Sequence, residues 1–131
     1  MHDRIEVSAR EQVVGDDLAE AEFDARFRLL QSQYLSELPQ RRKTTASLWA
    51  ASMRDAASPA WHELHVLTHR LSGSAPCYGL EAVGEAAQEV DRLLSAKPPC
   101  RELSVLRPVI SRLLNLLDAA IAASRPKSGL S

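Results

Sequence analysis

The chain has 131 residues, which is room for one domain. Its 16 basic and 17 acidic residues give a formal charge of −1, so net charge favours neither nucleic acid nor a membrane surface as a partner. No apolar run approaches the roughly 20 residues that a membrane-spanning helix needs, and the N-terminus lacks the apolar segment of a secretion signal. We therefore expect a cytoplasmic protein whose two cysteines, Cys77 and Cys100, are reduced thiols.

The composition favours helices over strands. Five glycines are too few for a sheet protein with many tight turns, and no glycine-rich phosphate-binding motif occurs. No stretch alternates polar and apolar residues for long enough to indicate a strand, whereas Ala, Leu, Glu, Arg and Gln are good helix formers. The sequence predicts an all-α protein, an antiparallel up-down bundle of four helices joined by short connectors.

The first predicted helix follows a polar lead-in over residues 1–15, and it opens a bundle that spans residues 16–124. Proline inside a helix removes a hydrogen bond, so Pro39 predicts that this helix is either long and kinked or split in two. The segment 125–131 is expected to be a flexible tail. The apolar side of the first helix is predicted from residues that recur at threes and fours: Leu18, Phe23, Phe27, Leu30, Tyr34, Leu35 and Leu38.

Three further helices follow. Ser58-Pro59 combines a capping residue with a proline at the first helical position, which predicts a helix that runs to about Ala75. Pro76 and Gly79 mark a turn, and helices over about 80–95 and 101–124 come next, separated by a proline-containing connector. The apolar residues of these two helices are Val83, Ala87, Val90, Leu93 and Leu94, and then Leu103, Leu106, Ile110, Leu113, Leu114, Leu117 and Ile121.

The helix over 59–75 has two distinct faces at 100° per residue. Its apolar face comprises Trp61, Leu64, Leu67, Thr68, Leu71 and Ala75. The opposite face carries His62, His65, His69 and Gly73, and so holds three of the four histidines of the chain. Three interpretations compete for this stripe: a solvated polar face, a metal site, and a nucleophilic histidine with open space beside it.

The spacing of the histidines weakens the metal interpretation. His62 and His69 lie about 10 Å apart along the helix axis, too far for one ion to bridge easily, and no HExxH pattern occurs. Gly73 favours the nucleophile, because a glycine inside a helix costs about 1 kcal/mol relative to alanine and here clears space one turn beyond His69. The alternative, a glycine that simply lies near the helix end, carries about equal weight.

The run from Trp61 to Ala75, with His69, Leu71, Gly73, Ser74 and Ala75 in register and Gly79 following, resembles the histidine-containing phosphotransfer (HPt) domain family. The family pattern is H-x-L-K-G-S/A-A with a glycine a few residues on. Upstream, the segment 27–41 is similar to the first bundle helix of the family, and residues 80–94 are similar to its third. The resemblance covers roughly residues 20–120.

The resemblance implies a phosphorelay intermediate in two-component signalling, a carrier rather than a kinase. It implies that His69 accepts a phosphoryl group from a receiver-domain aspartyl phosphate and passes it to another receiver domain. The expected partners are therefore response-regulator receivers, including those of hybrid sensor kinases. The resemblance implies no cofactor or metal on this chain, since Mg²⁺ belongs to the receiver. We expect a monomer, because the bundle closes its own core.

One position departs from the family pattern: Ser72 stands where the family usually has lysine. The expected effect is slower or weaker transfer, since an exposed charge contact contributes about 1 kcal/mol or less. Arg70 is a candidate to replace that charge. The basic cluster 41–43 is another, although a solvated basic patch is the favoured interpretation of that cluster. Ser72, Gly73, Arg70 and His65 are the expected supporting residues. Flanking apolar residues are the expected docking contacts for the receiver: Val66, Pro76 and Tyr78.

Two other functions remain open at this point. The missing lysine leaves room for a docking module that binds a partner without phosphotransfer. The histidine stripe leaves room for a metal-binding bundle that uses His62, His65 and His69.

Overall fold

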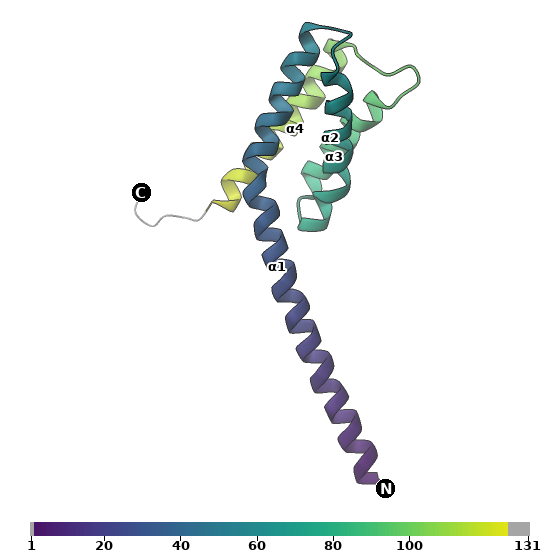
Figure 1. Ribbon diagram of the computed structural model, residues 1–131, viewed down its shortest axis with the longest axis vertical. Coiled ribbons are helices and arrows are strands. Elements are labelled where there is room, and N and C mark those ends of the chain that lie inside the picture. Colours follow the sequence, from purple (N-terminus) through teal and green to yellow (C-terminus); the bar gives the residue numbers. More distant parts are fainter. Residues whose placement is uncertain (1, 126–131) are drawn as a thin grey trace, which may run out of the picture. The chain divides into compact units, whose positions relative to one another are not determined.

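A computed structural model describes residues 2–125, which contain helices and no strand. The elements are α1 (His2–Arg54), α2 (Ala60–Ser74), a short 3₁₀ helix η1 (Pro76–Tyr78), α3 (Glu81–Leu94) and α4 (Leu103–Ser124) (Figure 1). The all-helical class with four main helices is confirmed. Within residues 2–125, none of these helices combines the length and the apolar character that crossing a membrane requires.

Helix α1 starts earlier than predicted, and at Pro39 it follows the first of the two predicted alternatives, a single long helix. It begins at His2 rather than after the polar lead-in, and it continues through Pro39 to Arg54, so the alternative of two short helices is wrong. Pro39 lies on the exposed side of α1. The carbonyl that the proline leaves without a donor is that of Leu35, which is half-buried, and the helix continues despite the lost hydrogen bond. The predicted tail beyond Arg125 lies outside the described residues.

The chain divides into two compact units, residues 1–34 and 35–131. In the first unit, Leu18, Phe23 and Leu30 are 62%, 68% and 51% exposed, so the predicted burial of these three side chains is wrong. Their spacing correctly predicts a helix. A single helix, however, gives them no second element within this unit against which to pack.

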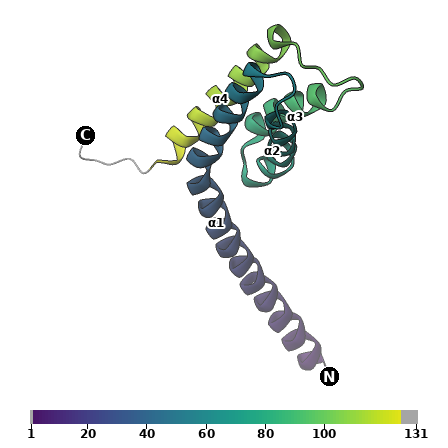
Figure 2. The ribbon, with the colours of Figure 1, turned by 45° about the horizontal axis from the view of Figure 1, so that its top comes forward.

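The second unit holds a continuous apolar core. Helix α2 packs against α3, and α3 packs against α4 (Figures 1 and 2). The predicted apolar faces supply this core, with Leu67, Leu93, Leu103 and Leu114 only half-buried at its edge. Burial of each large apolar side chain contributes about 1.5–3 kcal/mol. The largest fully buried apolar side chains are Leu38, Leu64, Leu71, Val90, Leu106, Ile110, Leu113 and Leu117.

The start of α2 is fixed by local contacts. The Ser58 hydroxyl accepts a hydrogen bond from the backbone N–H of Ala60 at 3.1 Å, as expected of a capping residue. Trp61 is 4% exposed. It meets Trp49 edge to face at 6.3 Å between ring centroids, and its Nε1 donates to the carbonyl of Asp55 at 3.1 Å. These contacts fix the rotation of α2, and with it the direction of the histidine stripe.

The turn between α2 and α3 depends on two glycines. Gly79 ends η1 with φ of 84°, a left-handed conformation that favours glycine. Gly84 is buried on α3 against Pro76 of η1, and a Cβ built on it would lie 2.7 Å from Cδ of that proline and closer still to Cγ. This close approach sets how α3 lies along α2, and so which α3 side chains reach the histidines.

Candidate functional site

The histidine stripe of α2 lies on the surface, as the helical spacing predicts. His62 is exposed, and the side chains of His65 and His69 are 34% and 73% exposed. The opposite face of the same helix is buried through Trp61, Leu64, Thr68, Leu71 and the neighbouring Ala75. The core side thus holds α2 in place while the ring of His69 remains accessible to another molecule.

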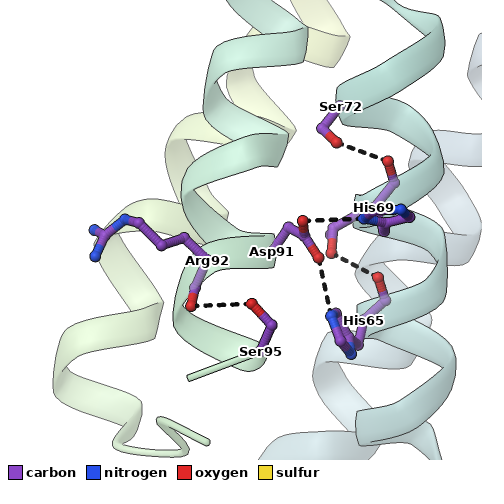
Figure 3. A network of polar contacts seen from close by, with 7 residues as sticks. His65, His69, Ser72, Asp91, Arg92 and Ser95 are labelled. Atoms are coloured by element: carbon purple, nitrogen blue, oxygen red, sulfur yellow. Dashed lines mark hydrogen bonds and ion pairs between the residues drawn. The ribbon is translucent and has the colours of Figure 1, made fainter. Parts of the chain in front are cut away.

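A carboxylate from the neighbouring helix joins two of these histidines. Asp91 of α3 lies with Oδ2 3.1 Å from Nδ1 of His69 and Oδ1 2.9 Å from Nε2 of His65 (Figure 3). The His69 contact has hydrogen-bond geometry. Oδ1 is buried and accepts no well-aligned hydrogen bond within residues 2–125, so the 2.9 Å approach of His65 Nε2 is a close contact that is an ion pair only when His65 is protonated.

Asp91 is the part of this site that the sequence interpretation misses. It lies beside Val90, on the border of the apolar face of α3, and its side chain is only 18% exposed. An acidic residue next to a buried stripe is a weak signal by itself, because many such residues point to solvent. The site becomes visible only when α3 is placed against α2, 22 residues along the chain from His69.

Around His69 the surface is open on the side of the helix C-terminus. A Cβ built on Gly73 would meet nothing within 4 Å, so no neighbour in the free protein requires a glycine there. The Ser72 hydroxyl donates to the backbone carbonyl of His69 at 2.7 Å and is directed along the helix rather than toward the imidazole (Figure 3).

Two grooves border α2. The first, of about 450 Å³, contains the rings of all three histidines and is lined by His62, His65, Val66, His69, Arg70, Asp91 and Ser95. The second, of about 530 Å³, runs between α1 and α2 and is lined by Gln40, Arg41, Thr44, Leu48, His62, Glu63, Val66, Leu67, Arg70 and Leu71. Of the expected docking residues, Val66 lines both grooves, while Pro76 and Tyr78 belong to η1 and line neither.

The model of the Hpt domain family matches residues 29–123, a span that includes α2, α3 and most of α4. The chain belongs to this family. Searches of curated proteins and of solved structures find no match to the chain. Hpt domains act in histidine phosphotransfer in two-component signalling, and they interact with the receiver domains of response regulators.

Compared with the family pattern, this Hpt domain has a different arrangement of positive charge near the histidine. Arg70 is the cationic side chain that lines the groove containing His69. Arg41 and Arg42 are paired with Glu37 and Asp118, each at 2.8 Å, so these two members of the basic cluster 41–43 hold acidic partners. Arg92 of α3 points away from the histidines (Figure 3). Arg70 is thus the arginine that shares a groove with His69.

Within the described part of the chain, no three His, Cys, Asp or Glu side chains are arranged to hold one ion. Cys77 and Cys100 are free thiols, exposed and half-buried respectively.

Proposed function

We propose that His69 is the phosphoacceptor of this Hpt domain, taking a phosphoryl group from the aspartyl phosphate of one receiver domain and passing it to the aspartate of another. The observation that carries the proposal is the exposure of His69, 73%, on a rigid helix with open space at Gly73 one turn away. A histidine buried in the core would not be reachable by the carboxylate pocket of a partner protein.

Phosphoryl transfer requires from this chain mainly an imidazole ring that the receiver can reach. The lone pair of a neutral imidazole nitrogen attacks phosphorus, a nitrogen–phosphorus bond forms, and the bond to the receiver aspartate breaks with its electron pair returning to that carboxylate. The reverse sequence on a second receiver regenerates the free histidine. We propose that Mg²⁺ is supplied by the receiver and that this chain needs no cofactor. It acts as a carrier and not as a kinase.

The surface around His69 suggests how a receiver docks. Val66 and Arg70 lie in the groove beside the histidine and offer an apolar contact and a positive charge. Pro76 and Tyr78, in η1 just beyond α2, are further proposed contacts. We further propose that the four helices run up and down in antiparallel order and that the protein is a cytoplasmic monomer. Its receivers belong to response regulators or hybrid sensor kinases.

The test is phosphoryl transfer from a phosphorylated receiver, followed with labelled phosphate. Wild-type protein is expected to gain label that acid removes and alkali does not, as for a phosphoramidate, and His69→Gln is expected to gain none. His62→Gln, a change of the same kind on the same exposed stripe, serves as the control and should keep its label. Failure of the wild type to accept label from any phosphorylated receiver, or full labelling of His69→Gln, contradicts the proposal.

A second function, docking without transfer, is favoured by one specific observation. Ser72 occupies the position where the family usually carries lysine, and its hydroxyl is engaged by the backbone of α2. If the domain only docks, the receiver should bind His69→Gln as well as it binds the wild type. Neither the wild type nor His69→Gln should then gain label from the phosphorylated receiver. The same experiment, with binding measured in parallel, separates the two functions.

A further inference from the structure

One side of α1 over residues 16–30 carries exposed acidic and apolar side chains in a fixed order along a continuous helix (Figure 1). We propose that this side, the docking face, binds a helix of another protein whose contact surface is basic at one end and apolar at the other. The docking face is independent of the proposed function, because it includes neither His69 nor any residue that lines the groove around it.

The apolar half of the docking face holds two large side chains that remain exposed. Phe23 and Leu30 are 68% and 51% exposed. They are seven residues apart, which places them about 20° from each other around the helix, and the half-buried Phe27 lies between them. Helices in proteins are stabilised mainly by packing of such a stripe, and apolar residues at i, i+4 and i+7 are the pattern that a partner in helix recognition buries.

The acidic half of the docking face lies toward the N-terminus. Asp16 and Glu20 are exposed, and Asp16 lies seven residues before Phe23, so it points in the direction of the apolar stripe. Asp16, Glu20 and Asp24 follow at intervals of four, a spacing at which like charges destabilise a helix. Within the part of the chain that the structure describes, none of these three carboxylates forms an ion pair. Cationic side chains of a partner would relieve the repulsion at this end.

The order of acidic and apolar residues decides between occupants of the docking face. A second copy in parallel would set Asp16 against Asp16 and Glu20 against Glu20, and an antiparallel copy over the whole face would set Asp16 against Leu30. The first arrangement repels, and the second buries a carboxylate against an apolar side chain. The segment 16–30 also carries five carboxylates against two arginines, so two copies, or the segment and an anionic membrane, repel each other. A helix that brings lysine or arginine to the acidic half satisfies both halves.

The other side of the same helix provides matched controls. Leu18 and Leu29 are 62% and 63% exposed, and they lie about 120–140° around the helix from Phe23. They are eleven residues apart with Glu22 between them, which interrupts the apolar stripe. Asp17 and Glu22 are exposed and lie about 100–120° from Phe23, so they carry the same charge as the acidic half in a different direction.

The test uses synthetic peptides and the full-length protein. The docking face extends about 21 Å along the helix axis, so each peptide is a helix of about the same length or slightly longer, with lysine on one half of one face and leucine on the other half. Two such peptides have the lysines at opposite ends, which covers both helix directions. A third has the same composition with lysine and leucine scrambled around the helix. Fluorescence anisotropy measures binding near physiological ionic strength, and circular dichroism checks the helix content of each variant.

The apolar half is tested by two double substitutions of equal size. One of the ordered peptides is expected to bind the wild type at least about tenfold more tightly than the scrambled peptide. Phe23→Gln with Leu30→Gln should weaken that binding about tenfold or more, because it removes both exposed apolar anchors. Leu18→Gln with Leu29→Gln should change it less than about twofold.

The acidic half is tested by two double substitutions that remove the same charge. Asp16→Asn with Glu20→Gln should weaken binding of the ordered peptide about fivefold to tenfold, and Asp17→Asn with Glu22→Gln should weaken it no more than about twofold. Equal losses in these two variants would show general attraction of a basic peptide to an acidic helix and would overturn the inference. So would equal binding of the ordered and scrambled peptides.

Two further measurements test the other occupants directly. Sedimentation equilibrium of the wild type is expected to show a single copy, and vesicles of phosphatidylcholine and phosphatidylglycerol are expected not to bind it. A dimer that Phe23→Gln with Leu30→Gln dissociates would make a second copy the occupant of the docking face. Vesicle binding that the same variant abolishes would make a membrane the occupant, and either result overturns the inference.

Discussion

Two glycines on neighbouring helices lie in opposite surroundings. Gly73 of α2 lies on the open face, which we define as the surface around His69 and Gly73, and an added Cβ there would meet nothing within 4 Å. Gly84 of α3 lies in the packed joint, defined as the contact of Gly84 with Pro76, where an added Cβ would lie 2.7 Å from Cδ of the proline and closer still to its Cγ. One glycine is required by packing, and the other is not required by anything in the free protein.

The contrast between these two positions separates two reasons for which a helix can contain a glycine. Each costs about 1 kcal/mol relative to alanine in a helix interior. At Gly84 the close approach of two elements offsets that cost within the fold. At Gly73 no such contact exists, so the remaining explanations are clearance for a partner and simple proximity to the end of α2. The substitutions below separate these explanations.

The largest effect is expected from Gly84→Ala. The new methyl group would overlap a rigid proline ring, and overpacking of this kind typically costs about 1–3 kcal/mol. We expect a lower free energy of unfolding, measured by denaturant titration. Pro76→Ala in the same chain should recover part of the loss, because it removes the ring atoms that the methyl group meets. A Gly84→Ala protein as stable as the wild type would show that the packed joint can relax.

Gly73→Ala should change stability and transfer in opposite directions. Its backbone does not adopt a left-handed conformation, so alanine fits and should raise the free energy of unfolding by up to about 1 kcal/mol. If the bare position admits the phosphoryl group or the receiver, transfer to His69 should fall about tenfold. Denaturant titration and timed transfer on the same preparation measure both. Unchanged transfer would mean that Gly73 does not provide clearance for a partner and is simply a glycine near the end of α2.

Ser72→Lys tests the departure from the family pattern on the open face. The serine hydroxyl is satisfied by the backbone carbonyl of His69 and offers the phosphoryl group no charge. Lysine at this position adds a positive charge one turn along the face, a contribution of about 1 kcal/mol or less at an exposed site. We expect transfer to become up to about fivefold faster at low salt, with Ser72→Ala unchanged as the control. A lysine variant no faster than the wild type would indicate that Arg70 already supplies the charge.

The sequence predicts the open face better than it predicts the site as a whole. Helical spacing alone places Leu64 and Leu71 in the core and His69 on the surface, because one helix has one buried side. It does not place Asp91, since that requires knowing which residues of α3 face α2. The spacing also fails at Leu18 and Phe23, where a helical pattern is present but the packing partner is not.

His65 lies one turn before His69 on α2, on the side away from the packed joint, and its substitution gives the smallest expected effect. His65→Gln removes the ring that approaches Oδ1 of Asp91 but leaves the hydrogen bond from His69 to Oδ2 intact. The carboxylate regains some rotational freedom, so transfer should slow only about twofold to threefold, an effect on the scale of losing one partly exposed ion pair. Stability should change little, because the side chain is one-third exposed. His62→Gln is again the matched control. In timed transfer assays, a loss of about tenfold or more would mean that His65 acts on the phosphoryl group itself, and His65 would then belong to the open face.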